Sequence, residues 1–218
     1  MILGIYGSGG LGREVLENAR QINSVSQKWE DIVFIDDYAE TAERNGAKIF
    51  SFPKVKETYS TKTLEISVAV GEPSTRKKLY DKLEQEGYGL TAIVHPTAIV
   101  SGYSEIEPGV VVGAFSFISC NIKIGANSYI QPHVNIGHDC VLGKHTVISS
   151  NAILAGSCLL GDGVYIGMGV PVKEGTSIGE WTIIGMGSVV YNDIRENAIA
   201  IGNPARIMKN NDERKVFK

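Results

Sequence analysis

Residues 130–148 read IQPHVNIGHDCVLGKHTVI, and this stretch decides the fold. Its aliphatic residues Ile130, Ile136, Leu142 and Ile148 stand six positions apart. Neither a helical period of 3.6 residues nor a simple alternation produces this spacing. The stretch therefore belongs to a repeat, which has to be followed in both directions before any local element is assigned.

The six-residue spacing continues far beyond this stretch without an insertion. From Val94 to Val190, all 17 positions of the register are Ile, Leu or Val. The positions two residues earlier, from Ala92 to Ser188, are small or aliphatic throughout. Glycine follows the aliphatic residue in 8 of the 17 repeats, which indicates regular turns between short strands.

This repeat predicts a triangular prism of stacked strands, that is, a parallel β-helix. Side chains of a strand alternate between its two faces, so the aliphatic residue and the small residue two places before it both point inward. Three hexapeptides complete one coil, which places each residue over the one 18 positions earlier. At the parallel-strand spacing of about 4.8 Å, the prism is roughly 27 Å tall. The spacing fixes the period of the coil but not its handedness.

Residues 1–92 have a different pattern, which predicts a Rossmann-like unit. An apolar strand over 1–6 runs into the loop GSGGLG (7–12), and a helix is expected from Leu11 to about Ile22. A second strand over 32–35 ends in Asp36 and Asp37. A third strand is expected over 66–70, and a second helix from 74 to about 86.

The glycines of this loop allow a backbone to approach a phosphate held at the helix N-terminus. The unit is too short for both halves of a dinucleotide fold, so a single nucleotide is the expected ligand. Two plainer interpretations stay open: the glycines serve only a turn, and the two aspartates are solvated loop charges.

The composition excludes several classes of protein. The net charge is −3, whereas a nucleic-acid-binding protein is expected to carry a basic patch. No run of about 18 apolar residues is present to cross a membrane, and the N-terminus lacks the features of a signal peptide. Three cysteines, an odd number, favour free thiols in a reducing compartment, so a cytoplasmic protein is expected.

The strongest candidate for a catalytic group is His138, which Asp139 follows immediately. Acyl transfer from a thioester needs a base for the nucleophile and a donor for the developing oxyanion. A neighbouring carboxylate can orient an imidazole and stabilise its protonated form. Gly156 lies 18 residues further on, one coil above, so its N–H is the candidate oxyanion donor. The plainer alternative is a surface histidine beside a surface aspartate.

The other histidines and the cysteines are weaker candidates. His95 is expected to be structural at the seam before the repeat, whereas His133 and His145 are expected at exposed turns. Cys140 and Cys158 fall in the small inward register and are expected in the core, which leaves Cys120 as the cysteine able to reach the surface.

The repeat resembles the hexapeptide-repeat acyltransferases over residues 93–209. The resemblance implies a left-handed β-helix and trimers with active sites in grooves between the prisms. Together with the N-terminal unit, the chain is similar to bacterial nucleotide-sugar acetyltransferases of the sialic-acid O-acetyltransferase group. This group includes the enzymes that act on UDP-4-amino-sugars in bacillosamine synthesis and on GDP-perosamine. The matching segments, in chain order, are Ile5–Gly10, Phe34–Asp37, Ala69–Gly71 with Arg76–Lys78, and Ile136–Cys140.

The resemblance implies roles for particular residues. His138 and Asp139 match the base dyad, and no metal is required. The nucleotide-sugar site is expected to contain Ser8, Gly9, Gly10, Asp36, Asp37, Gly71 and Arg76. The acetyl-CoA site is expected to contain Gly156, Met168, Gly185, Met186, Arg206 and Lys209, the last two of which suit phosphates. Leu11 departs from the pattern, because many relatives carry His at this position.

The sequence therefore predicts an α/β Rossmann-like nucleotide-sugar-binding domain (1–92), a left-handed β-helix domain (93–200) and a C-terminal cap (201–218). The predicted function is transfer of an acetyl group from acetyl-CoA to an amino or hydroxyl group of a nucleotide-linked sugar in glycan biosynthesis. Three alternatives remain: O-acetylation of a sugar or amino acid without a nucleotide, a γ-type zinc carbonic anhydrase using His133 and His138, and a solenoid without enzymatic activity.

Overall fold

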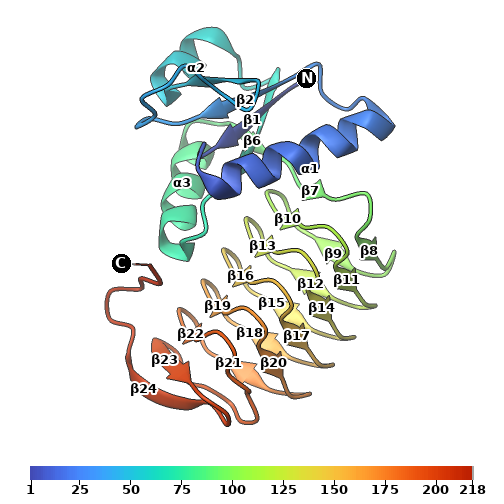
Figure 1. The fold of residues 1–218 in the computed structure, drawn as a ribbon, viewed down its shortest axis with the longest axis vertical. Helices are drawn as coiled ribbons and strands as arrows, with labels where there is room; N and C mark the ends of the chain where they lie inside the picture. The colour runs from blue at the N-terminus through green and yellow to red at the C-terminus, as the bar shows by residue number, and fades with distance from the viewer. Residues whose placement is uncertain (218) are drawn as a thin grey trace.

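A computed structural model describes residues 1–217 and consists of a small α/β part followed by a regular coil (Figure 1). The last position of the predicted cap, 218, lies outside the described residues. The first part holds a six-stranded sheet of order β3-β4-β2-β1-β5-β6. Its elements, in chain order, are β1 (Ile2–Tyr6), α1 (Gly10–Ser26), β2 (Asp31–Ile35), β3 (Glu43–Arg44), β4 (Ala47–Phe50), α2 (Phe52–Thr58), β5 (Leu64–Val68), α3 (Pro73–Gln85) and β6 (Gly89–Leu90).

The glycine loop between β1 and α1 is required by close packing. A Cβ atom on Gly12 would lie 2.0 Å from the carbonyl oxygen of Gly7, so only glycine lets the helix start this close to the strand. Gly7 itself has φ +109°, which favours glycine as well. The predicted strands and helices of this part occur, with α1 longer than expected, whereas β3, β4, α2 and β6 were not predicted. No helix within residues 1–217 is both long and apolar enough to cross a membrane.

The second part is the predicted left-handed parallel β-helix, built from two-residue strands on three faces. The first face holds β7 (Ile93–Val94), β10 (Val111–Val112), β13 (Tyr129–Ile130), β16 (Val147–Ile148), β19 (Tyr165–Ile166) and β22 (Ile183–Ile184). The second holds β8 (Ile99–Val100), β11 (Phe117–Ile118), β14 (Asn135–Ile136), β17 (Ile153–Leu154) and β20 (Pro171–Val172). The third holds β9 (Glu105–Ile106), β12 (Lys123–Ile124), β15 (Val141–Leu142), β18 (Leu159–Leu160) and β21 (Ser177–Ile178).

The register confirms that residues 18 apart lie one over another. Ile118 pairs with Ile136, and Ile136 pairs in turn with Leu154. From Gly109 to Gly187 the corners between faces are sharp because one residue in each takes a left-handed conformation, as do Asn127 with φ +57° and Asp139 with φ +60°. Asn, Asp and Gly tolerate this conformation best, so the corner residues are a signal in the sequence for the turns.

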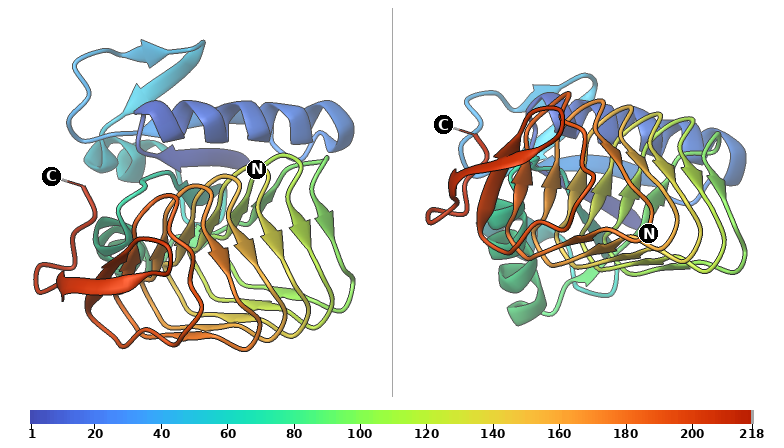
Figure 2. Two further views of the ribbon diagram at one scale, coloured as in Figure 1. Left: turned by 60° about the horizontal axis from the view of Figure 1, so that its bottom comes forward. Right: turned by 90° about the horizontal axis from the view of Figure 1, so that it is seen from below.

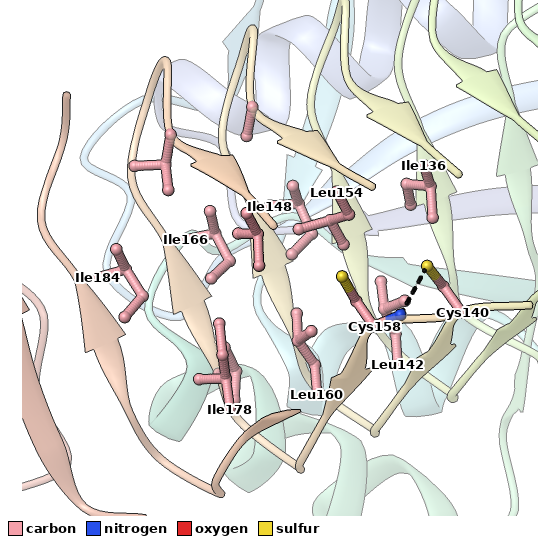
Figure 3. Packing of buried hydrophobic residues seen from close by; sticks show 14 of the residues in the cluster. Ile136, Cys140, Leu142, Ile148, Leu154, Cys158, Leu160, Ile166, Ile178 and Ile184 are labelled. Atoms are coloured by element: carbon pink, nitrogen blue, oxygen red, sulfur yellow. Dashed lines mark hydrogen bonds between the residues drawn. The ribbon is translucent and has the colours of Figure 1, made fainter. Parts of the chain in front are cut away.

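The inward side chains of successive coils form one continuous apolar core (Figure 3). Ile136, Leu154 and Val172 are each at most 2% exposed, although they come from three different coils. Cys140 and Cys158 lie in the same core, as predicted, and the Cys158 N–H approaches Cys140 Sγ at 3.4 Å. Each coil therefore depends on its neighbours for burial, as stacked repeats do.

The α/β part covers the first face of the prism. Helix α1 lies along this face (Figure 2), and its buried residues Val15 and Leu16 join a core cluster with the outward side chains Val111, Tyr129 and Val147. On the other two faces several outward apolar side chains are exposed instead. They are Ile99, Phe117 and Ile153 on the second face and Val141 and Leu159 on the third. At the far end, strands β23 (Ala198–Ile201) and β24 (Arg206–Asn210) pair as an antiparallel hairpin.

Candidate active site

His138 and Asp139 occupy the corner that joins the second face to the third. His138 follows β14, and its side chain is half exposed. Its Nδ1 lies 2.8 Å from Oδ2 of Asp139. A carboxylate only accepts hydrogen bonds, so Nδ1 is the donor and Nε2 is left as the free basic nitrogen. The pair therefore has the arrangement of a base and the group that orients it.

Asp139 is itself held in place by the coil below. The side-chain N–H₂ of Asn121, 18 residues earlier, donates to Asp139 Oδ1 at 3.0 Å. The hydrogen bond from Asn121, followed by that from His138, holds the pKa of Asp139 below its ordinary value. Asp139 is thus an ionised acceptor facing the imidazole, which suits it to stabilise an imidazolium.

Gly156 lies directly against the imidazole ring from the coil above. A Cβ atom at this position would sit 2.5 Å from Cε1 of His138 and 2.7 Å from Nε2. The Gly156 N–H makes no hydrogen bond within residues 1–217, whereas the N–H of the next residue, Ser157, bonds to the carbonyl of His138. The predicted base and the predicted oxyanion donor are therefore adjacent at one corner.

A second candidate region is a cavity of about 530 Å³ at the carboxyl ends of β1, β2 and β5. Six of the seven residues expected at a nucleotide-sugar site line this one cavity: Ser8, Gly9, Gly10, Asp36, Asp37 and Gly71. Crevices at this edge of a parallel sheet are the usual ligand sites of α/β folds. The N-terminus of α1 opens onto the cavity at Gly10, where its positive end favours an anion.

The two aspartates at the end of β2 organise the wall of this cavity. Asp36 Oδ2 accepts hydrogen bonds from the N–H of Ser8 at 3.0 Å and from its hydroxyl at 2.6 Å. Burial alone would raise the pKa of Asp36, but these hydrogen bonds, with that from the Tyr38 N–H, hold it below its ordinary value. The glycine loop is therefore tied to the end of the neighbouring strand.

Asp37 belongs to a polar group that the sequence analysis did not find. Its Oδ2 accepts from the Tyr6 hydroxyl at 2.7 Å, and Lys82 of α3 donates to the same hydroxyl at 2.8 Å. All three residues line the cavity. Tyr38, which is 93% exposed, adds an aromatic ring at the lining. Tyr6 lies in the matching segment Ile5–Gly10 but was given no role, and nothing local pointed to Lys82, because α3 reaches the cavity through tertiary packing.

The prediction that Arg76 contacts the nucleotide is wrong. Its side chain is fully buried and does not line the cavity. The guanidinium donates to the carbonyl oxygens of Val68 at 2.8 Å and Val70 at 3.0 Å, and to Asn127 O at 2.8 Å and Oδ1 at 3.1 Å. With four hydrogen bonds to the protein, it joins the loop after β5 to a corner of the β-helix.

The residues expected at the acetyl-CoA site lie on different edges of one chain. Met168 and Met186 follow β19 and β22, at the corner between the first and second faces, and both are exposed. The N–H of Gly187 bonds to the carbonyl of Met168, so these turns stack one over the other beside Gly185. Arg206 and Lys209 are exposed on β24. Within one chain, only Gly156 of this set adjoins His138.

Both parts of the chain match known protein families. Residues 3–83 match the model of the PglD N-terminal domain, and residues 121–156 match that of the bacterial transferase hexapeptide with six repeats. No curated protein matches the chain by sequence. WeeI from Acinetobacter baumannii is 30% identical with a TM-score of 0.88, over 95% of this chain and all of that one. The chain belongs to the bacterial hexapeptide transferases with a PglD-type N-terminal domain. It is an acyltransferase.

Two further solved structures are similar over nearly their whole length. The acetyltransferase domain of PglB from Neisseria gonorrhoeae is 28% identical with a TM-score of 0.89, over 95% of this chain and 99% of that one. PerB from Caulobacter crescentus, solved with CoA and GDP-perosamine, is 30% identical with a TM-score of 0.86, over 96% and 98% of the two chains.

The remaining histidines of this hexapeptide transferase lie away from His138. The expectation that His145 is exposed is wrong: it is 4% exposed, because α3 packs on its corner and places the Tyr80 ring 5.2 Å from the imidazole. His133 is exposed at another corner and stacks on Phe115. His95 is buried beside Thr97, as a structural residue would be. Within the described part of the chain, no three His, Cys, Asp or Glu side chains group as metal ligands.

Proposed function

We propose that this hexapeptide transferase moves an acetyl group from acetyl-CoA to an amino or hydroxyl group of a nucleotide-linked sugar. The observation that carries the proposal is the meeting of three groups at one corner. His138 has a free Nε2, Asp139 orients its ring at 2.8 Å, and the unpartnered N–H of Gly156 lies on the adjacent coil.

These groups suffice for direct transfer in a ternary complex. The acceptor nitrogen or oxygen attacks the thioester carbonyl carbon while His138 Nε2 takes its proton. The Asp139 carboxylate stabilises the resulting imidazolium, and the Gly156 N–H donates to the carbonyl oxygen as it becomes an oxyanion. The C–S bond then breaks, and the departing CoA sulfur receives the proton from His138. Because the acceptor attacks the thioester directly, no acyl-enzyme is needed, and the buried Cys140 and Cys158 take no part.

A nucleotide-linked acceptor is supported by the cavity in the α/β part. The cavity combines a glycine loop, a helix N-terminus and two ionised aspartates at a strand end. This combination suits a phosphate and the hydroxyl groups of a ribose. PerB, which is similar throughout, was solved with a nucleotide sugar. We therefore propose residues 1–92 as the acceptor-binding domain, 93–200 as the transferase domain and the remaining residues as its cap.

The division of the expected donor site over separate edges supports a homotrimer. His138 lies at one edge of the prism, and Met168 and Met186 lie at another. A neighbouring copy can bring its methionine edge to the His138 edge and form a groove for the pantetheine arm. The exposed apolar residues of the second and third faces, among them Ile153 and Leu159, would be covered by such packing.

A thiol-release assay with acetyl-CoA and a panel of UDP-, GDP- and dTDP-linked amino-sugars tests the proposal. Turnover with a nucleotide-linked sugar, together with saturable binding of the matching nucleotide, is expected. Turnover with free sugars or amino acids alone, without nucleotide binding, would show that the acceptor carries no nucleotide and would overturn the proposed acceptor class. Failure of the wild-type protein to bind acetyl-CoA would overturn the proposed reaction.

A further inference from the structure

The segment after β24, residues 211–217, runs back along the prism to the α/β part (Figures 1 and 2). Asn211 anchors its start: it is 5% exposed, and its side-chain N–H₂ donates to the carbonyl of Trp181 at 2.7 Å. The guanidinium of Arg214 then lies over the Trp181 ring, 4.9 Å from its centre. We call residues 211–217 the strap.

The strap is fastened to the residue that precedes α3. The backbone N–H groups of Val216 and Phe217 both donate to Oε2 of Glu72, at 2.9 and 3.0 Å. Hydrogen bonds to a carboxylate are stronger than those between neutral groups. The other oxygen, Oε1, is buried without a hydrogen-bond partner in the described chain, which would cost free energy if nothing held the carboxylate there. The two strap N–H groups are thus the specific partners of this side chain.

The ring of Phe217 fits between the cavity wall and the β-helix. It packs edge-on against Tyr165 of β19, with ring centres 5.8 Å apart. A Cβ atom on Gly71 would also lie 3.6 Å from the Phe217 ring, in ordinary van der Waals contact. Gly71 lines the cavity, and Glu72 follows it directly. The end of the strap therefore supports the turn that forms one wall of the cavity.

This turn, residues 69–72, is held from two sides. Arg76 fixes the carbonyls of Val68 and Val70 to Asn127, and the strap fixes Gly71 and Glu72. The strap also continues directly from β24, which carries Arg206 and Lys209 of the expected donor site. It is thus continuous with one proposed substrate region and reaches the other through hydrogen bonds and van der Waals contact.

We propose that the strap positions the acceptor site, with Phe217 and Glu72 as positioning residues that fix the Gly71 wall for a nucleotide-linked sugar. This inference rests on the proposed function, because it assigns the cavity to the acceptor. It adds that the cap of the β-helix takes part in acceptor binding although it contributes no group to the chemistry.

The first test measures the anchoring without any substrate. Trypsin cleaves after Arg214 and Lys215, which are exposed in the strap. We expect Glu72→Ala to be cleaved there about tenfold faster than wild type, because local opening controls cleavage of a docked segment. Glu84→Ala removes a carboxylate on α3 that makes no contact with the strap. It is the matched control and is expected to be cleaved like wild type. Equal cleavage of Glu72→Ala and wild type would overturn the anchoring.

The second test measures the acceptor. We expect Phe217→Ala to raise the KM for the nucleotide sugar about tenfold, with kcat and the KM for acetyl-CoA within twofold of wild type, as for loss of an aromatic contact. Phe217→Tyr is expected to restore the wild-type KM, and Met208→Ala, at an exposed position of β24, to leave it unchanged. An unchanged acceptor KM in Phe217→Ala would overturn the role of the strap.

The two failures can be told apart. If wild type binds no nucleotide sugar, the proposed acceptor is wrong, and the positioning role falls with it even where Glu72→Ala is cleaved faster. If wild type binds a nucleotide sugar and Phe217→Ala binds it equally well, the proposed function stands and only the strap proposal is overturned.

Discussion

Gly156 packs so closely on the imidazole of His138 that a Cβ atom would come 2.5 Å from Cε1. Real Cβ atoms do not approach ring atoms at this distance, so any other residue must displace the ring. The glycine at this point of the repeat is therefore set by the histidine one coil below, and not by a turn, because Gly156 does not have a positive φ.

Gly156→Ala is expected to lower kcat about 10²–10³-fold, because it displaces both the base and the oxyanion donor. Thiol release under saturating substrates gives the rate, and the thermal midpoint checks the fold. Gly102→Ala is the matched control: Gly102 lies in the same column of corners, and a Cβ atom there meets nothing within 4 Å. Equal rates for the two variants would contradict the assignment of this corner.

Ile153→Asp is expected to give a monomer without activity. Ile153 is 47% exposed on the second face, and a carboxylate buried in an apolar interface is strongly unfavourable. Light scattering coupled to gel filtration measures the mass. Val25→Asp, at a 75% exposed position of α1, is expected to keep the mass and activity of wild type. A fully active monomer would show that one chain contains the whole site.

The buried His145 makes folding stability depend on pH. Burial, followed by the charge of Arg76, lowers the pKa of His145 from its ordinary 6.5 to about 4. As the pH falls from 6.5 towards 4, the unfolded chain binds a proton that the folded chain does not, so stability is lost in this window. The difference between the two pKa values of His145 corresponds to a loss of about 3 kcal/mol in the free energy of unfolding.

Urea unfolding of wild type and His145→Gln at several pH values measures this effect. Carboxylates also titrate in the range, so the difference between the two proteins is the informative quantity. The wild type is expected to lose more stability than the variant between pH 6.5 and 4, and parallel curves would contradict the burial of a neutral imidazole.

Arg76→Met is expected to lower the free energy of unfolding by about 3 kcal/mol, because it leaves the carbonyls of Val68 and Val70 and both oxygens of Asn127 without their donor. Urea titration measures the loss. Lys77→Met, beside it on α3, breaks only an exposed ion pair with Asp81 and is expected to cost less than about 1 kcal/mol. A loss of similar size in both variants would refute the structural role of Arg76.

The architecture was largely predictable because it depends on local periodicity. The 18-residue spacing of Ile136 and Leu154 is enough to predict that they stack. The same spacing places Gly156 over His138. Arg76 and His145 were misjudged for the opposite reason. Both residues are buried because α3 packs on the corner at Asn127. This contact joins segments about 50 to 70 residues apart, so no local sequence pattern predicts it.

The expected donor residues show a further limit. Met168 and Met186 are 18 residues apart and share a column, whereas Met168 is 30 residues from His138, so the spacing alone places the two on different edges. Which edges meet depends on packing between copies of the chain, and no spacing within one sequence indicates it. The strap was missed because a short polar segment after β24 has no period, and its partner Glu72 lies 144 and 145 positions away from Val216 and Phe217.

The most direct test of the proposed chemistry is thiol release by His138→Ala with acetyl-CoA and the preferred acceptor. The variant is expected to lose turnover by about 10³-fold or more, since general-base catalysis supplies roughly 10²–10⁴, while its affinity for acetyl-CoA stays close to that of wild type. A folded His138→Ala protein that turns over at the wild-type rate would contradict the account.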